Sequence, residues 1–120
     1  MAKILIVDDD WTNLETMKKA CLFLGHQATL CDSGNQVCQL AMEDQPDLIL
    51  LDMRMTDLDG IGVLQRLRNE PATRQIPVVF ITAGQEEAER VLVKAAGAKD
   101  YLSKPVSLAT LQAVIQKYTV

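Results

Sequence analysis

The sequence of 120 residues predicts a doubly wound α/β fold, a three-layer sandwich with one parallel sheet between two layers of helices. Five strand-like runs alternate with stretches of helical periodicity, which is the pattern of repeated strand–helix units. The strongest runs are aliphatic without polar alternation, as expected for strands that are buried on both faces. They cover residues 3–7, 48–51 and 77–81.

The first strand, residues 3–7, leads into a helix with an apolar stripe. Thr12 and Glu15 have the spacing of a capping box, so this helix is expected to begin near Trp11 or Thr12. Gly25 is expected to end it, because glycine readily adopts the left-handed conformation found after helices.

The second strand, residues 26–31, has a weaker pattern. Ser33 and Gln36 can form a capping pair at the start of the second helix, and Pro46 is expected to end that helix. The third strand, residues 48–52, is the central one, because four aliphatic residues run without a break and stop at a carboxylate.

A loop over residues 53–60 follows and closes with a turn signal. The third helix then runs to about residue 69, and the fourth strand covers 77–81. A fourth helix and a short edge-like strand over 100–103 complete the alternation, and Ser107 is expected to cap a last helix. The apolar stripes of these three helices are Val63, Leu64 and Leu67; Ala88, Val91, Leu92 and Ala95; and Leu108, Leu111, Ile115 and Tyr118.

The composition indicates a single globular domain over residues 1–120, because 48% of the residues are hydrophobic and no linker or low-complexity tract interrupts the chain. A formal net charge of −4 disfavours direct nucleic-acid binding. No apolar run approaches the ~20 residues of a membrane span, and no signal peptide is recognisable, so we expect a cytoplasmic location without membrane binding. Three cysteines without metal-ligand spacing are expected to be free thiols: Cys21, Cys31 and Cys38.

Polar residues follow four of the predicted strands at the point where each strand ends. Asp8 and Asp9 follow the first strand, Asp52 ends the third, Thr82 follows the fourth and Lys104 follows the fifth. Because parallel strands end at the same edge of a sheet, these side chains are expected to meet in one crevice. Each residue alone has an ordinary explanation, such as a carboxylate favoured near a helix N-terminus. Those explanations do not account for all of them at successive strand ends.

The chemistry of this set points to phosphoryl transfer. Three carboxylates held together repel one another, and a hard divalent cation such as Mg²⁺ relieves the repulsion. Lys104 supplies a positive charge for an anion beside the metal, and Thr82 supplies a hydroxyl donor. A metal, a lysine, a hydroxyl and a carboxylate that can act as nucleophile indicate phosphoryl transfer onto an aspartate.

These motifs resemble the response-regulator receiver family, the CheY-like domains of two-component signal transduction. The resemblance is carried by the residues at the strand ends, by the loop from Asp52 to Gly60, and by the segment from Gly97 to Pro105. It covers essentially the whole chain. It implies a (βα)5 flavodoxin-like fold with the sheet order 2-1-3-4-5, an order that is the family's own.

The resemblance also implies a role for each site residue. Asp52 would be the phosphorylation site. Asp9 and Asp52 would bind Mg²⁺ (or Mn²⁺) directly, the backbone carbonyl of Arg54 would be a further ligand, and Asp8 would act directly or through water. Lys104 would pair with Asp52 and then with a phosphoryl oxygen.

Thr82 and Tyr101 are the implied switch residues. Thr82 would bind another phosphoryl oxygen and be drawn inward, and Tyr101 would turn into the space that Thr82 leaves. The peptide bond between Lys104 and Pro105 is implied to be cis. These movements would bias an output surface formed by the fourth helix, the fifth strand and the fifth helix.

The phosphoryl group is expected to come from a sensor histidine kinase or a histidine phosphotransfer protein, because the sole histidine, His26, is placed away from the acidic cluster. A downstream effector domain or protein would read the output surface. The domain would catalyse its own Mg²⁺-dependent phosphorylation and autodephosphorylation, and would not be a conventional turnover enzyme. The sequence leaves open whether the chain is a free-standing regulator or part of a larger protein.

Two other functions fit part of the pattern. A haloacid-dehalogenase-type phosphatase also has an aspartate nucleophile, but it needs an acid two residues further on, where this chain has Arg54. A structural receiver that never turns over phosphate would not need the complete set of site residues. Trp11 is expected to shield the crevice partly and, as the only tryptophan, to report metal binding.

Two positions depart from the commonest family pattern. Thr56 stands where the loop after Asp52 usually has proline, which is expected to loosen the loop. Arg54 is a long cationic residue two positions after Asp52. We hypothesise that Arg54 affects the lifetime of the aspartyl phosphate, either by screening it from water or by pairing with it.

Replacement of this arginine tests the hypothesis. Arg54→Ala is expected to change the rate of autodephosphorylation, because it removes the side chain that would screen or pair with the acyl phosphate. The measurement is the decay of phosphorylated protein after removal of the phosphodonor. A decay rate equal to that of the wild type would show that Arg54 has no such role.

Overall fold

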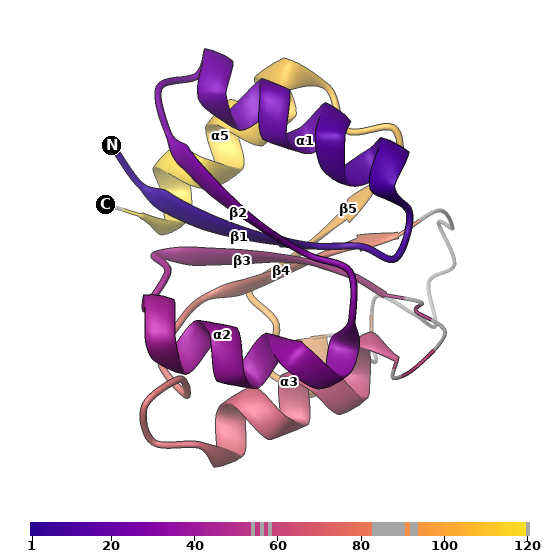
Figure 1. Cartoon of the computed structure of the whole chain (residues 1–120), viewed down its shortest axis with the longest axis vertical. Coiled ribbons are helices and arrows are strands. Elements are labelled where there is room, and N and C mark those ends of the chain that lie inside the picture. Colours follow the sequence, from indigo (N-terminus) through magenta and orange to yellow (C-terminus); the bar gives the residue numbers. More distant parts are fainter. Residues whose placement is uncertain (54, 56, 58, 83–90, 92–93, 120) are drawn as a thin grey trace.

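The computed structural model contains one five-stranded parallel sheet with helices on both faces, which confirms the predicted α/β class (Figure 1). It describes residues 1–53, 55, 57, 59–82, 91 and 94–119. The sheet order is β2-β1-β3-β4-β5, as the resemblance implied. The strands are β1 (Lys3–Val7), β2 (Gln27–Cys31), β3 (Leu48–Asp52), β4 (Val78–Thr82) and β5 (Asp100–Ser103).

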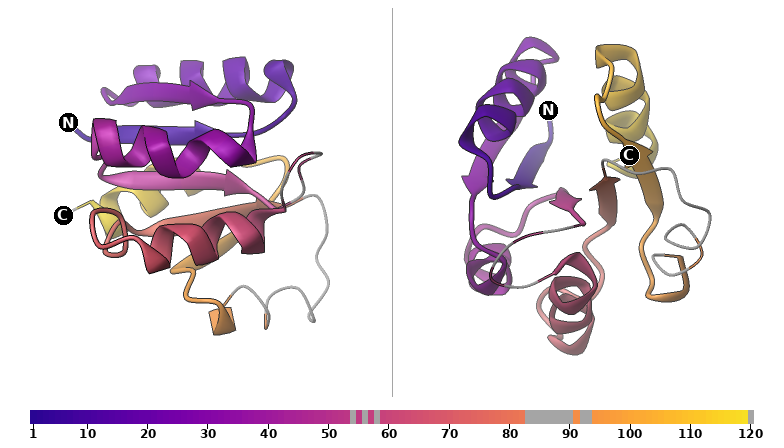
Figure 2. Two further views of the ribbon diagram at one scale, coloured as in Figure 1. Left: turned by 60° about the horizontal axis from the view of Figure 1, so that its bottom comes forward. Right: turned by 90° about the vertical axis from the view of Figure 1, so that its right-hand side faces the viewer.

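Two pairs of helices cover the two faces of the sheet. Helices α1 (Trp11–Phe23) and α5 (Leu108–Tyr118) lie on one face, and α2 (Val37–Asp44) and α3 (Gly60–Asn69) lie on the other (Figure 1). The right-hand view of Figure 2 looks onto the carboxyl ends of the strands and shows the same two layers. A 3₁₀ turn, η1 (Gly34–Gln36), precedes α2. Most of the helix predicted after the fourth strand lies outside the described residues.

Burial on both sides explains the unbroken aliphatic runs. Every residue of β3 is buried. Ile49 and Leu51 belong to the apolar cluster on the α2–α3 side, whereas Leu48 and Leu50 belong to the cluster on the α1–α5 side. Successive side chains of a strand point to opposite faces, so each face needs its own apolar set. The strand that ends at Asp52 is therefore fixed by packing on both faces.

Two of the predicted helix caps are wrong. The N-cap of α1 is Asp10, whose carboxylate accepts a hydrogen bond from the backbone N–H of Thr12 at 2.9 Å, so Thr12 lies inside the first turn and cannot cap it. Ser33 makes no capping bond at the start of η1, because its hydroxyl donates to Asp57 instead. The cap predicted for α5 is confirmed, since Ser107 accepts a bond from the Thr110 N–H.

The predicted stripe of α5 is partly wrong. Leu111 and Ile115 are buried as expected, but Leu108 is 43% exposed and Val114 packs in the core in its place. Among the described residues, no helix combines the length and the apolar composition that a membrane span requires.

The corrected cap of α1 can be tested by a matched pair of variants. Asp10→Ala is expected to lower the free energy of unfolding by about 1 kcal/mol, because it removes the acceptor of an otherwise unpaired N–H in the first turn. Thr12→Ala is expected to have a smaller effect, since the Thr12 side chain does not cap the helix. Urea unfolding of both variants measures the difference. A larger loss of unfolding free energy for Thr12→Ala than for Asp10→Ala would contradict this assignment and favour Thr12 as the N-cap.

Candidate functional site

The sheet register brings the predicted strand-end residues together. Val7 of β1 pairs with Leu51 of the neighbouring strand β3, Asp8 directly follows Val7, and Asp52 directly follows Leu51. Thr82 ends β4 on the other side of β3, and the backbone N–H of Lys104 donates to the carbonyl of Thr82 at 2.7 Å. The residues predicted at the ends of four strands therefore lie at one edge of the sheet.

Asp8, Asp9 and Asp52 form a cluster of carboxylates. Each offers one oxygen, and these oxygens lie within 4.8 Å of one another. Asp8 and Asp52 are only 6% and 7% exposed, whereas Asp9 is exposed. This is a set of hard oxygen donors with one member open to solvent, and it fits a Mg²⁺ ion that keeps several waters.

Lys104 is the cation of this cluster. Its ammonium Nζ lies 3.2 Å from Oδ2 of Asp8 and 3.5 Å from Oδ2 of Asp52, so it contacts both acids and not Asp52 alone. Burial of the ammonium is the largest single effect on the pKa of Lys104 and lowers it, but attraction by Asp52 and Asp8 outweighs burial and leaves the pKa above its usual value. The described contacts of the cluster thus bring one ammonium to three carboxylates, and this set of hard oxygen donors suits a divalent cation.

The loop after β1 is held close to these acids. Oδ1 of Asp8 accepts a hydrogen bond from the backbone N–H of Asp10 at 2.9 Å, while its Oδ2 faces Lys104. The peptide bond between Lys104 and Pro105 is cis, as the resemblance implied. Arg54, whose backbone carbonyl was the further implied ligand, lies outside the described residues.

The two implied switch residues share one side of the sheet. Thr82 is 2% exposed and follows Phe80 by two residues on β4, and Tyr101 pairs with Phe80 across β4 and β5. The ring of Tyr101 is 5% exposed and belongs to the apolar cluster on the α2–α3 side. Thr82 and Tyr101 are thus both buried on the same face, next to the edge that carries the acids.

Trp11 makes a contact that the sequence did not predict. Its side chain is 52% exposed, and its Nε1–H donates to Oδ2 of Asp32 at 3.0 Å. Asp32 directly follows β2, so this bond connects the loops after β1 and β2. His26 is placed away from the acids, where its Nδ1 accepts a bond from the backbone N–H of Ala2.

Asp57 is a residue that the sequence did not single out. Its carboxylate accepts hydrogen bonds from the Ser33 hydroxyl at 2.6 Å, the Gly34 N–H at 3.0 Å, and the Asn35 N–H and side-chain amide at 3.2 and 3.1 Å. These bonds, led by that of Ser33, lower the pKa of Asp57 from 3.8 to about 2. The sequence carried no specific signal for this contact, because Ser33 itself was a suitable cap for the following helix.

A doubly wound sheet with an acidic cluster and a lysine at its carboxyl edge is the architecture of receiver domains. A profile of the response regulator receiver domain matches residues 4–116. The chain therefore belongs to this family, a family of signalling proteins in two-component systems and not of metabolic enzymes.

Several known proteins are similar to this chain. Protein PilH of Pseudomonas aeruginosa is 37% identical over 111 residues, which are 92% of each chain. Response regulator PleD of Caulobacter vibrioides is 35% identical over 118 residues, which are 98% of this chain but only 26% of PleD. The chain thus spans nearly all of one relative and about a quarter of another.

Solved structures agree with this assignment. The receiver domain of the sensor histidine kinase PA1611 from Pseudomonas aeruginosa, with a magnesium ion coordinated in its active site cleft, has a TM-score of 0.91 and 31% identity, with 98% of this chain and 97% of that chain covered. The chemotaxis protein CheY4 of Vibrio cholerae has a TM-score of 0.92 at 24% identity, with 98% of each chain covered, and supports the fold.

The lowered pKa of Asp57 predicts a dependence of stability on pH. Because the folded pKa of about 2 lies below the ordinary value of 3.8, ionised Asp57 stabilises the fold above pH 3.8, and this contribution disappears as the pH falls towards 2. In Asp57→Asn no charge is present to be lost. The gap in unfolding free energy between wild type and Asp57→Asn is therefore expected to be constant at neutral pH and to shrink under acid. Urea unfolding across this range measures it, and a gap independent of pH contradicts the assignment.

Proposed function

We propose that this protein is a phospho-accepting response-regulator receiver over residues 1–120, with Asp52 as the phosphoryl acceptor. The observation that carries the proposal is the convergence of Asp8, Asp9 and Asp52 with Lys104 at one edge of the sheet. The donor is a phosphohistidine on a sensor histidine kinase or a histidine phosphotransfer protein. The residue two after Asp52 is Arg54 and not an acid, so the haloacid-dehalogenase mechanism lacks its general acid–base.

The transfer uses the chain's own groups. A carboxylate oxygen of Asp52 attacks the phosphorus in line, the P–O bond forms as the P–N bond breaks, and the imidazole leaves with a proton from solvent. Asp8 and Asp9, with Asp52 and the backbone carbonyl of Arg54, would hold Mg²⁺ (or Mn²⁺). When bound, the ion would neutralise charge on the transferring phosphoryl group. The same site would later catalyse autodephosphorylation.

Lys104 and Thr82 sense the product. Lys104 contacts Asp8 and Asp52, so a phosphoryl group on Asp52 offers it a stronger anionic partner. Thr82 lies at the end of the neighbouring strand and donates its hydroxyl to another phosphoryl oxygen. Its inward movement, with that of Tyr101 on the same face, couples the acyl phosphate to the output surface.

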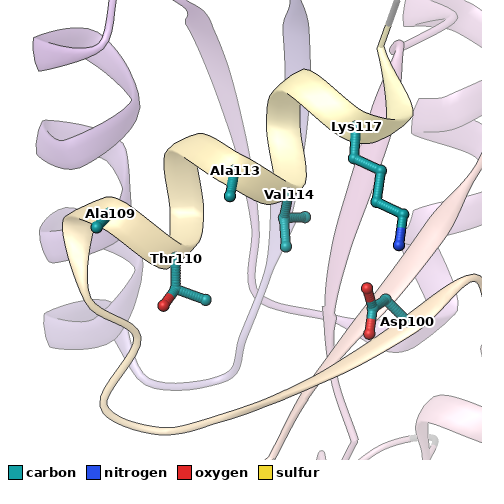
Figure 3. Close-up of a pocket in the computed structure, with 6 residues that line it drawn as sticks. All are labelled: Asp100, Ala109, Thr110, Ala113, Val114 and Lys117. Carbon is teal, nitrogen blue, oxygen red and sulfur yellow. The ribbon is translucent and has the colours of Figure 1, made fainter.

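The described part of the proposed output surface consists of β5 and α5. A depression of about 370 Å³ lies beside α5 and Asp100 of β5. Figure 3 shows the Lys117 side chain extending from α5 towards Asp100. The Tyr118 hydroxyl donates to Oδ2 of Asp100 at 2.9 Å and connects the two elements. An effector domain or protein would bind there. The depression is lined by Asp100, Ala109, Thr110, Ala113, Val114 and Lys117.

Phosphorylation by a small phosphodonor tests the proposal. Incubation with Mg²⁺ and acetyl phosphate is expected to add the mass of one phosphoryl group, and chelation of the metal is expected to prevent it. Asp52→Ala should abolish the modification. Asp47→Ala is the control, since it removes an exposed carboxylate that follows Pro46, just before the start of β3, at the opposite edge of the sheet. Modification that survives in Asp52→Ala would reject Asp52 as the acceptor.

A further inference from the structure

The segment that we call the 32–35 loop consists of Asp32 and Ser33 after β2 and the first two residues of η1, and it contacts the segments on both sides of the acidic cluster. Asp32 accepts the hydrogen bond of Trp11, which lies two residues after Asp9. Residues 33–35 donate the hydrogen bonds to Asp57, which lies five residues after Asp52. Among the described residues the carboxylate cluster consists of Asp8, Asp9 and Asp52, so the 32–35 loop touches its supports without contributing to it.

We propose that the 32–35 loop positions the metal site by holding the loops after β1 and β3 at a fixed separation. This inference rests on the proposed function, because it concerns the site that would bind Mg²⁺. Asp32 and Asp57 are positioning residues and not ligands. The ion they would serve is a hard divalent cation, whose affinity depends on the placement of several carboxylate oxygens at once.

The contact of Trp11 fixes the loop after β1. A half-exposed tryptophan can adopt several orientations, but a bond from its N–H to a carboxylate selects one of them. The preceding residues are anchored too, since Asp8 accepts the N–H of Asp10, and Asp10 caps α1. Asp9, the exposed member of the cluster, therefore lies in a segment that is tied on both sides.

The contacts of Asp57 fix the loop after β3. At the base of this loop the Gly60 N–H donates to the carbonyl of Met53 at 2.8 Å. A Cβ at Gly60 would meet the ring of Phe80 and would come within 3.0 Å of the Asp52 carbonyl oxygen, so the loop closes tightly on the strand end. The tip is then held at Asp57 by bonds to the 32–35 loop.

Arg66 of α3 orients Asn35, which donates hydrogen bonds to Asp57. It donates to Oδ1 of Asn35 at 3.2 Å, which turns the amide nitrogen of Asn35 towards Asp57.

Thr56, at a position where proline would restrict the backbone, leaves the loop with more conformational freedom in the unfolded chain. The four bonds to Asp57 supply a restraint of another kind in the folded protein.

Substitutions at Asp57 separate positioning from charge. Asp57→Ala and Asp57→Asn both remove one negative charge, but only asparagine retains an oxygen acceptor, which can keep either the bond of Gly34 to Oδ1 or the bonds of residues 33 and 35 to Oδ2. If position matters, Asp57→Ala is expected to raise the Kd for Mg²⁺ about tenfold, with a smaller rise for Asp57→Asn. Asp32→Ala and Asp32→Asn form a second, independent pair, since asparagine can still accept the bond of Trp11.

Calorimetric titration with Mg²⁺ measures the Kd of each variant. Asp47→Asn and Asp47→Ala are the matched controls, because Asp47 is an exposed carboxylate that accepts a backbone N–H from Lys3 at 2.8 Å at the far edge of the sheet. Both controls are expected to bind Mg²⁺ like the wild type. Phosphorylation by acetyl phosphate should recover in the Asp57 and Asp32 variants at saturating Mg²⁺, which a global loss of structure would not allow.

The outcomes are distinguishable. An equal rise in the Kd for Mg²⁺ in the alanine and asparagine variants at both positions would show that only the charge of these residues acts. An unchanged Kd would show that the hydrogen bonds of Asp32 and Asp57 do not affect the metal site. Either result overturns the inference and leaves the proposed function intact. Should Asp57→Ala not fold, the Asp32 pair decides. A wild-type protein that neither binds Mg²⁺ nor is modified at Asp52 would reject the proposed function itself, and the inference with it.

Discussion

Repulsion among the carboxylates of Asp8, Asp9 and Asp52 is the constraint on which the rest of the structure depends. Two of them are buried, where charges need partners, and Lys104 contacts both of these buried acids. Strand ends can hold them there because β1 and β3 are packed on both faces and paired in fixed register. Packing of the core therefore stabilises an arrangement of the carboxylates that their mutual repulsion disfavours. Such a cluster of carboxylate oxygens is the kind of site that a hard divalent cation prefers.

The fold could be predicted because its signals are local and repeated. The run that ends at Asp52 has no polar residue before it, and only a strand between two helix layers requires that pattern. The convergence of Asp8, Thr82 and Lys104 followed from a general property of parallel sheets, and the structure places them as expected. The sheet order and the cis bond after Lys104 came from the family resemblance alone.

The cap of α5 was predicted correctly, but the caps at α1 and η1 and the loop contacts were not, because nearby groups with similar energies compete for the same donors. Asp10 and Thr12 both suit an N-cap, and the helix takes Asp10, two residues earlier in the chain. At η1 the acceptor is Asp57, 22 to 24 residues away in sequence, and no local pattern reveals which acid will arrive there. The sequence therefore specifies the strand-borne acids better than the loops around them.

This division between strands and loops bears on how the site works. Asp8 and Asp52 are placed by buried strands, so their separation changes little unless the core itself is disrupted. Asp9 lies in a loop and is exposed, and its position depends on side chains that lie outside the sheet, such as Trp11 and Asp32. The acidic cluster thus combines two acids fixed by the sheet with one whose position can change. Under the proposed function, changes in these outer contacts would alter metal affinity and phosphoryl lifetime while Asp52, Lys104 and the core remain the same.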